Sequence, residues 1–328
     1  MGNHIPSPAP TNNLAFNYLN EGRDWTGDAC GMEQSPIDIV PSDTQLCNEK
    51  MKMQLYLTDH TLSDLKVQDL GNTLMAEGSF SKLVATDVAG NNYEFEAIQF
   101  HFHAPSEHTI NGKHYDLELH IVHQMTPESA KNAKTSRNLA VVGVFFDLDT
   151  DSNATPNPFI DALKLHNVGS NISMNMNDLL GEELTDGMAY YAYQGSLTTP
   201  PCTQNANFYI MDKPLKITKT QLEQFNLRWK DNINFANGHG NNRPVQPLNG
   251  RTVMQSKNCC VHRRSDELYN IIMKKEDSII ENTKKSSLEG VIKRDIMFSD
   301  LSLGGGLKAA GNTHGFIETS GTRTKPMI

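Results

Sequence analysis

The chain has 328 residues, 38% of them hydrophobic, which is enough for one large domain with a core plus an appended segment. Its formal net charge of −9 argues against a nucleic-acid-binding protein and, more weakly, against binding to anionic membranes. No stretch approaches the ~18 consecutive apolar residues of a transmembrane helix. Residues 1–13 are predicted to be flexible and lack the apolar run of a signal peptide. We therefore expect either a cytosolic protein or one whose targeting segment is missing from this sequence.

Residues 14–262 are predicted to form a mainly β domain of the α+β class. Short apolar runs alternate there with clusters of Gly, Pro, Asn and Asp, a pattern typical of many strands joined by turns. The clearest expected strands cover residues 93–104, 115–123 and 138–147. The clearest expected helices cover residues 158–165 and 219–225.

Residues 263–328 differ in character and are interpreted as a C-terminal extension. Basic doublets such as Lys274-Lys275 alternate there with apolar residues at roughly helical spacing. The pattern favours one or two loosely docked helices, and a helix that binds a partner or a second copy is the alternative. The glycine-rich end, around Gly304-Gly305-Gly306, is expected to be disordered.

One expected strand carries a pattern that suggests a metal site. In Gln99-Phe100-His101-Phe102-His103, successive side chains point to opposite faces of the strand. The two phenylalanines are therefore expected to enter a core, while His101 and His103 line a cavity together with Gln99. A single His-x-His pair is nevertheless more often two structural or exposed histidines than a metal site.

A third histidine lies on the next expected strand. Glu118, His120 and Val122 share one face of that strand, so two paired strands can bring three imidazoles to one point. Three neutral nitrogens at ~2.0–2.1 Å, with a fourth position open to water, form a catalytic zinc site. Gln99 and Glu118 are the candidates for orienting the rings. Spacing alone leaves a metal site and a purely structural histidine cluster about equally supported.

Five motifs, in order along the chain, resemble the alpha-class carbonic anhydrases between about Phe16 and Val253. They are Gln34-Ser35-Pro36-Ile37-Asp38, Gln99 to His103 followed by Ser106-Glu107-His108-Thr109, Glu118 to His123, Gly195-Ser196-Leu197-Thr198-Thr199-Pro200-Pro201, and Asn242-Arg243-Pro244-Val245-Gln246-Pro247. The resemblance implies a single domain built on a large, mostly antiparallel twisted sheet with short surface helices. It also implies reversible hydration of carbon dioxide to bicarbonate and a proton, by attack of a zinc-bound hydroxide.

The resemblance assigns roles to individual residues. His101, His103 and His120 match the Zn²⁺ ligands, whereas His108 and His123 match structural positions. The catalytic residues it implies are Thr198, which accepts a hydrogen bond from the hydroxide, Glu107, which accepts the proton of Thr198, and Tyr18, which joins the water network. The substrate-binding residues it implies are Val122, Val141, Leu197, Thr198, Thr199 and Phe208. The family usually has Trp in place of Phe208, so the carbon dioxide pocket is expected to be somewhat looser here.

The sequence departs from the family where a histidine usually carries the proton to solvent. Asn72 occupies that shuttle position and cannot titrate near neutral pH. Leu70 and Met75 replace polar residues beside it. We predict that turnover is limited by proton transfer and rises when an imidazole-type buffer is added. His60 is an alternative shuttle that nothing in the sequence places near the site.

The cysteines bear on where the protein works. Cys30 and Cys202 match a disulfide of secreted family members, and the alternative is two buried thiols. With the acceptor sequons at Asn153 and Asn171, the match predicts a secreted or lumenal glycoprotein more than a cytoplasmic one. Cys47, Cys259 and Cys260 lie outside the family pattern, and their odd number suggests an intermolecular link or one free thiol.

Three functions compete. The intact ligand set favours an active hydratase that uses carbon dioxide and bicarbonate, binds sulfonamide-type inhibitors and has no nucleic-acid partner. The altered cavity mouth and the extension keep open a binding or storage module on the same scaffold, with self-association through residues 263–328 or the unmatched cysteines. Ester hydrolysis is expected only as a side activity.

Overall fold

The computed structural model describes residues 16–58, 61–133, 135–180 and 188–263. The chain separates into two units, Met1–Asp266 and Glu267–Ile328. The predictions made for residues 1–13, His60 and the C-terminal extension lie outside the described residues. None of the helices within the described ranges has both the length and the apolar character that a membrane crossing requires.

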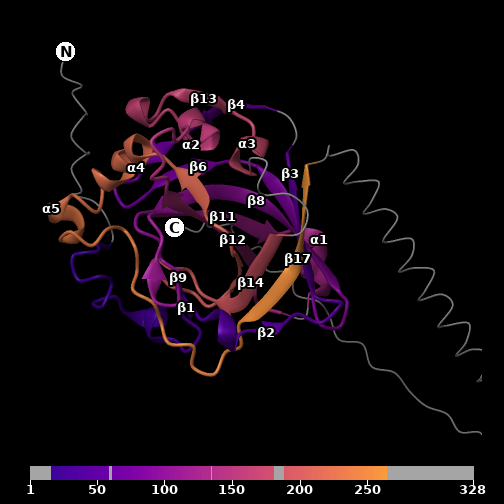
Figure 1. The fold of residues 1–328 in the computed structure, drawn as a ribbon. Coiled ribbons are helices and arrows are strands. Elements are labelled where there is room, and N and C mark those ends of the chain that lie inside the picture. The colour runs from indigo at the N-terminus through magenta and orange to yellow at the C-terminus, as the bar shows by residue number, and fades with distance from the viewer. Residues whose placement is uncertain (1–15, 59–60, 134, 181–187, 264–328) are drawn as a thin grey trace, which may run out of the picture. The chain divides into compact units, whose positions relative to one another are not determined.

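Strands far outnumber helices in the first unit (Figure 1). The strands are β1 (Asp38–Ile39), β2 (Gln45–Leu46), β3 (Lys52–Leu57), β4 (Leu62–Lys66), β5 (Gln68–Asp69), β6 (Leu74–Glu77), β7 (Ser81–Thr86), β8 (Asn92–His103), β9 (Thr109–Ile110), β10 (Lys113–His114), β11 (Leu117–Met125), β12 (Leu139–Leu148), β13 (Asn171–Met174), β14 (Met188–Gly195), β15 (Ala206–Met211), β16 (Leu215–Ile217) and β17 (Met254–Arg263). The helices are α1 (Pro127–Asn132), α2 (Pro158–Ala162), α3 (Asn177–Leu180), α4 (Lys219–Asn226) and α5 (Ile233–Ala236), with 3₁₀ turns at Gly27–Cys30, Pro41–Asp43 and Leu165–Asn167.

One large curled sheet forms the body of this unit. Its strand order is β11-β12-β15-β14-β17-β3-β7-β8-β6-β5. Because β8 also pairs with β11, the strands from β11 to β8 form a closed ring of pairings. Most pairings are antiparallel, while β12 pairs in parallel with β15 and β16, and β17 in parallel with β2 and β3. The predicted fold class, a mainly β domain on a large twisted sheet with short helices, is confirmed.

The expected strands and helices are present with shifted ends, and the shifts have local causes. β8 ends at His103 because Ala104 precedes Pro105, which has no N–H to continue a ladder. β11 starts at Leu117 rather than residue 115, since the Tyr115 N–H donates to the Ser106 hydroxyl instead of to a strand. The expected helix at 158–165 ends at Ala162, because Lys164 adopts a left-handed conformation with φ of 47°.

Two apolar clusters fix the alternation of β8 and β11. Phe100 and Phe102 enter the larger cluster, where they contact Phe159 and Phe225 with ring centroids 5.7 and 5.1 Å apart. The other faces of the same strands carry the histidines, beside a second cluster that includes Val122. Burying the phenylalanine rings thus holds the histidine face toward the opposite side of the sheet.

Candidate active site

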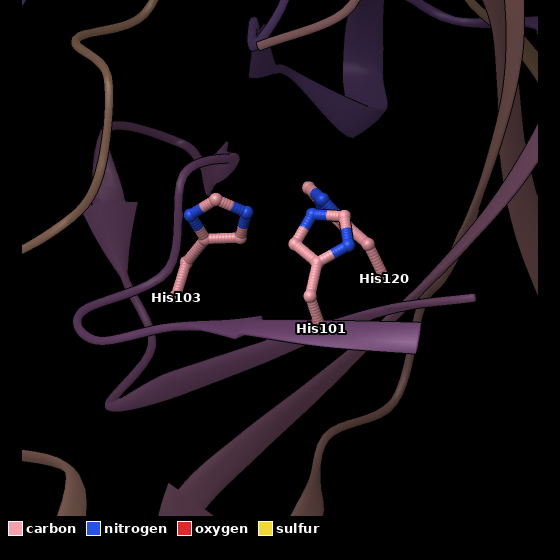
Figure 2. Close-up of side chains that lie close together, drawn as sticks. All are labelled: His101, His103 and His120. Atoms are coloured by element: carbon pink, nitrogen blue, oxygen red, sulfur yellow. The ribbon is translucent and has the colours of Figure 1, made fainter. Parts of the chain in front are cut away.

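Three histidines from two adjacent strands converge on one point (Figure 2). His101 on β8 lies directly opposite His120 on β11 in the antiparallel register, and His103 follows two residues along the same face. Their ring centroids are 4.8–5.2 Å apart. One nitrogen from each ring lies within 4.8 Å of the corresponding nitrogens of the other two. All three side chains are buried, so the cluster lies inside the protein.

The outward nitrogen of each ring faces a hydrogen-bond acceptor. His101 Nδ1 lies 2.9 Å from Gln99 Oε1, His103 Nδ1 lies 2.8 Å from the carbonyl oxygen of Asn241, and His120 Nε2 lies 2.8 Å from Glu118 Oε1. Because these partners only accept, the outward nitrogens donate and the inward ones carry lone pairs. His103 Nε2 is buried without a hydrogen-bond partner in the described part of the chain. The donor set therefore fits a zinc ion with a fourth position for water.

Burial keeps two of these rings neutral. It lowers the pKa of His101 well below its ordinary value and that of His103 to about 3. Burial also opposes the charged form of His120, but the charge and hydrogen bond of Glu118 outweigh it and raise the pKa of this ring. Metal ligation needs neutral imidazole, so binding a cation here releases any proton held by His120.

Glu118 connects the site to its surroundings. Its Oε1 accepts hydrogen bonds from His120 and from His108 Nδ1 at 2.7 Å, and its Oε2 accepts from the backbone N–H groups of Glu107 and His108 at 2.8 and 2.9 Å. Burial alone would raise the pKa of Glu118, but His108 and His120 hold it well below the usual range. His108 also lies 2.6 Å from the Tyr193 hydroxyl. It therefore supports Glu118, and His108, Glu118 and His120 form a second group of buried side chains that could hold a metal ion.

The structure places Glu107, Thr198 and Tyr18 at the same site. Glu107 is fully buried, and its Oε2 lies 3.4 Å from His103 Nε2 and 3.9 Å from His120 Nδ1. Burial raises the pKa of Glu107 to about 7, against the lowering effect of a side-chain hydrogen bond with Thr198. The pKa of Tyr18 lies well above its usual value, through burial and then through the charge of Glu107.

An apolar wall adjoins the histidines. Val122 on β11 pairs with Val141 on β12, which in turn pairs with Phe208 on β15, so the three side chains lie in one row across three strands. Leu197 packs against the same cluster. Phe208 stacks on Tyr193 at 5.2 Å between centroids and lies 5.8 Å from the His120 ring. Thr199, two residues after Leu197 in the sequence, is also buried, at 5% exposure.

Sequence reasoning missed Asn241, which orients His103 through its backbone. Its side chain also accepts a hydrogen bond from the N–H of Ala104 and donates to the carbonyl oxygens of Phe102 and Asn72. A backbone carbonyl leaves no mark in a sequence, and the only signal was the adjacent Asn242-Arg243-Pro244 motif. Asn72, expected at the cavity mouth, is only 5% exposed.

The predicted Cys30–Cys202 bridge is not formed in the structure. Both residues are free thiols, with Cys30 exposed and Cys202 buried, and Cys47 is a third, half-buried thiol. The side chains of Cys259 and Cys260 are outside the described residues. Nearby hydrogen bonds already join the two regions, since Gln34 Nε2 donates to the carbonyl oxygens of Asp28 and Cys202.

The curled sheet and the buried three-imidazole cluster together define an enzyme of the carbonic anhydrase class. The model of the eukaryotic-type carbonic anhydrase family matches residues 20–257, which is more than half of the chain, and the chain therefore belongs to that family.

Individual relatives agree with this assignment. A carbonic anhydrase of Klebsiella pneumoniae is 33% identical over 227 residues, covering 69% of this chain and 80% of that protein. The alpha-carbonic anhydrase of Thermovibrio ammonificans, solved with the inhibitor sulfanilamide, is 34% identical with a TM-score of 0.50, covering 68% and 87% of the two chains. A halotolerant carbonic anhydrase of Dunaliella salina is 27% identical with a TM-score of 0.57, covering 74% and 98%.

Proposed function

We propose that this chain catalyses the zinc-dependent, reversible hydration of carbon dioxide to bicarbonate and a proton. The observation that carries the proposal is the inward set of three imidazole nitrogens within 4.8 Å of one another, each ring held from behind by an acceptor. His101, His103 and His120 would hold the ion. When bound, zinc is a Lewis acid that lowers the pKa of a water from about 15.7 to about 7, an effect for which carbonic anhydrase is the established example.

The residues around the histidines would orient the reacting oxygen. Thr198 hydrogen-bonds with Glu107, a buried carboxylate that also accepts from the Arg243 N–H at 3.0 Å. The Thr198 hydroxyl directs its proton to a carboxylate, so it can only accept a hydrogen bond from the reacting oxygen. The reacting oxygen therefore turns its hydrogen toward Thr198 and a lone pair away from it. We assign Thr198 and Glu107 the role of orienting the reacting oxygen so that one of its lone pairs faces the substrate.

The apolar wall would hold the carbon dioxide. Val122, Val141 and Phe208 offer no hydrogen bonds, which suits a small molecule without a dipole and lets the more polar product leave. Proton release then limits the cycle, because Asn72 cannot accept a proton in the neutral range. We therefore infer that turnover depends on buffer.

Stopped-flow measurement of carbon dioxide hydration tests this proposal. We expect zinc-loaded protein to catalyse hydration, a sulfonamide or a chelator to abolish it, and Thr198→Ala to lower kcat/KM about 10- to 100-fold. Thr203→Ala is the matched control, because this hydroxyl donates to the exposed Asp28 carboxylate, at 3.2 Å. Zinc-loaded wild type without activity would contradict the proposal and favour a binding or storage role.

We also propose that the protein works in a secreted or lumenal compartment. The match of Cys30 and Cys202 to a disulfide of secreted relatives supports this, with the bridge forming only under oxidising conditions. Both predicted glycan acceptors are exposed, but the Asn171 amide donates to Asp64 Oδ1 at 3.2 Å while Asn153 lies in a turn. Intact-mass measurement after expression through a secretory pathway tests the assignment, and Asn153 is the expected major site.

A further inference from the structure

A buried arginine that the proposed chemistry does not use lies beside the Thr198 loop. Arg137, just before β12, is only 7% exposed although its guanidinium keeps its charge at any physiological pH. Burying such a charge is costly unless several partners satisfy it. The partners of Arg137 therefore show what the residue does.

Three of those partners are carbonyl oxygens at the two ends of one loop. Arg137 Nη1 lies 2.9 Å from the carbonyl oxygen of Gly195 and 3.3 Å from those of Gln204 and Ala206. Gly195, the last residue of β14, pairs with Ala206, the first residue of β15. The guanidinium thus links the two ends of the loop formed by residues 196–205, here called the Thr198 loop. The place where these two ends meet is called its neck.

A carboxylate completes the arrangement. Arg137 Nη2 donates to Glu33 Oε2 at 2.5 Å, and the Glu33 N–H donates to the Gln204 side chain, also at 2.5 Å. Glu33 therefore balances the buried charge and contacts the loop a second time. The adjacent Gln34-Ser35 segment holds the same loop, because Ser35 Oγ accepts from the Ser196 N–H at 3.1 Å.

We propose that Arg137 is a positioning residue that sets the place of Thr198 by fastening the neck of its loop, with Glu33 as counterion. The inference rests on the proposed function, because it assigns Thr198 a role in catalysis. Thr198 is three residues from Gly195, so loosening the neck displaces its hydroxyl relative to Glu107. A displacement of about 1 Å at a catalytic group can cost about 100-fold in rate.

The test compares Arg137→Met with Arg228→Met. Arg228, just after α4, is a matched control because it also donates to backbone carbonyls, those of Gln224 and Leu165, and faces a carboxylate, Asp69. We expect Arg137→Met to lower kcat/KM for hydration about 10- to 100-fold and kcat in dilute buffer much less, since proton release limits turnover there and does not pass through Thr198. Arg228→Met should stay within about twofold of wild type.

Two further measurements separate positioning from general destabilisation. In a Thr198→Ala background, Arg137→Met should change kcat/KM less than about threefold, because there is no hydroxyl left to position. Arg137→Lys, which keeps the charge but not the planar fork, should restore part of the lost activity and serves as the test if Arg137→Met does not fold. Equal losses with and without Thr198 would overturn the proposal.

Hydrogen exchange provides a readout that does not need activity. The Leu197 and Cys202 N–H groups bond within the loop to Thr203 and Thr199, and we expect their exchange to quicken about tenfold in Arg137→Met while β11 is unaffected. Unchanged exchange in the loop would overturn the inference. An inactive wild type would refute the proposed function alone, and the exchange data would still decide whether Arg137 fastens the loop.

Discussion

Asn241 joins His103 to Asn72. Its carbonyl oxygen accepts from His103 Nδ1 at 2.8 Å, and its side-chain amide donates to the Asn72 carbonyl oxygen at 2.9 Å. One residue thus fixes the orientation of a candidate metal ligand and the backbone of Asn72, the residue at the proposed proton-shuttle position. A substitution of the Asn72 side chain leaves both hydrogen bonds available, because Asn72 takes part in only the second one and does so through its backbone carbonyl.

Asn72→His is expected to raise the hydration rate in dilute buffer. The imidazole supplies a group that titrates near neutral pH, which the wild-type position lacks. Wild-type turnover should rise with added imidazole-type buffer, and this dependence should weaken in the variant. Stopped-flow assays at several buffer concentrations measure both effects. Asn91→His, the same change in an exposed turn, is the control, and a wild-type rate indifferent to buffer would refute the shuttle argument.

Glu118→Gln is expected to weaken zinc binding about 10- to 100-fold. The carboxylate accepts from His120, His108 and two backbone N–H groups, and a neutral amide offers a single oxygen and two donors instead. Competition with a chromogenic chelator measures the affinity. Glu128→Gln removes an exposed carboxylate on α1 and should leave the affinity unchanged. Equal affinities for the two variants would show that Glu118 does not orient His120.

Acid should destabilise the metal-free protein partly through His123. Its ring is buried between Ser81 Oγ, at 2.8 Å, and the carbonyl oxygens of Ile121 and Ala140, and burial lowers its pKa to about 4. Between an ordinary pKa near 6.5 and this value the unfolded chain binds the extra proton, so the free energy of unfolding falls as pH decreases from about 7 to about 4. The loss from this residue is on the order of 3 kcal/mol.

Urea unfolding of metal-free His123→Gln across this pH range measures that contribution. The variant is expected to have a shallower pH dependence than wild type, by up to one proton. His166→Gln, at an exposed position, should keep the wild-type slope. If the slopes of all three proteins coincide, His123 is not the buried neutral group described above.

Oxidation should link Cys30 to Cys202. The bridge would connect the N-terminal segment to the Thr198 loop and is expected to add about 2–5 kcal/mol to the free energy of unfolding. Peptide mapping of oxidised protein, with and without reductant, identifies the pair. Cys47→Ser should leave the linked peptide in place, whereas finding Cys30 and Cys202 unlinked after oxidation would remove the main support for secretion.

The sequence could predict the histidine cluster because strand alternation is a local property. His101, His103 and His120 needed only a period of two along two strands and their pairing. The partners Gln99 and Glu118 followed from the same alternation. The family resemblance, rather than spacing, supplied Glu107 and Thr198, which lie on loops far apart in the chain.

The contacts that could not be predicted act through the backbone or across long separations. Asn241 orients His103 with a carbonyl group that every residue type has, and Arg137 holds carbonyls of residues more than fifty positions away. Closure of the sheet through β17 and β3 joins segments from opposite ends of the domain. The early end of α2 depended on one left-handed residue, Lys164, whose side chain does not favour that conformation.

Zinc titration of the metal-free protein tests the central claim most directly. Carbon dioxide hydration should increase linearly with added zinc, stop rising at one equivalent per chain, and be lost when any one of His101, His103 and His120 is replaced by alanine. Activity that needs no zinc, or one tightly bound zinc per chain without hydration activity, would contradict it.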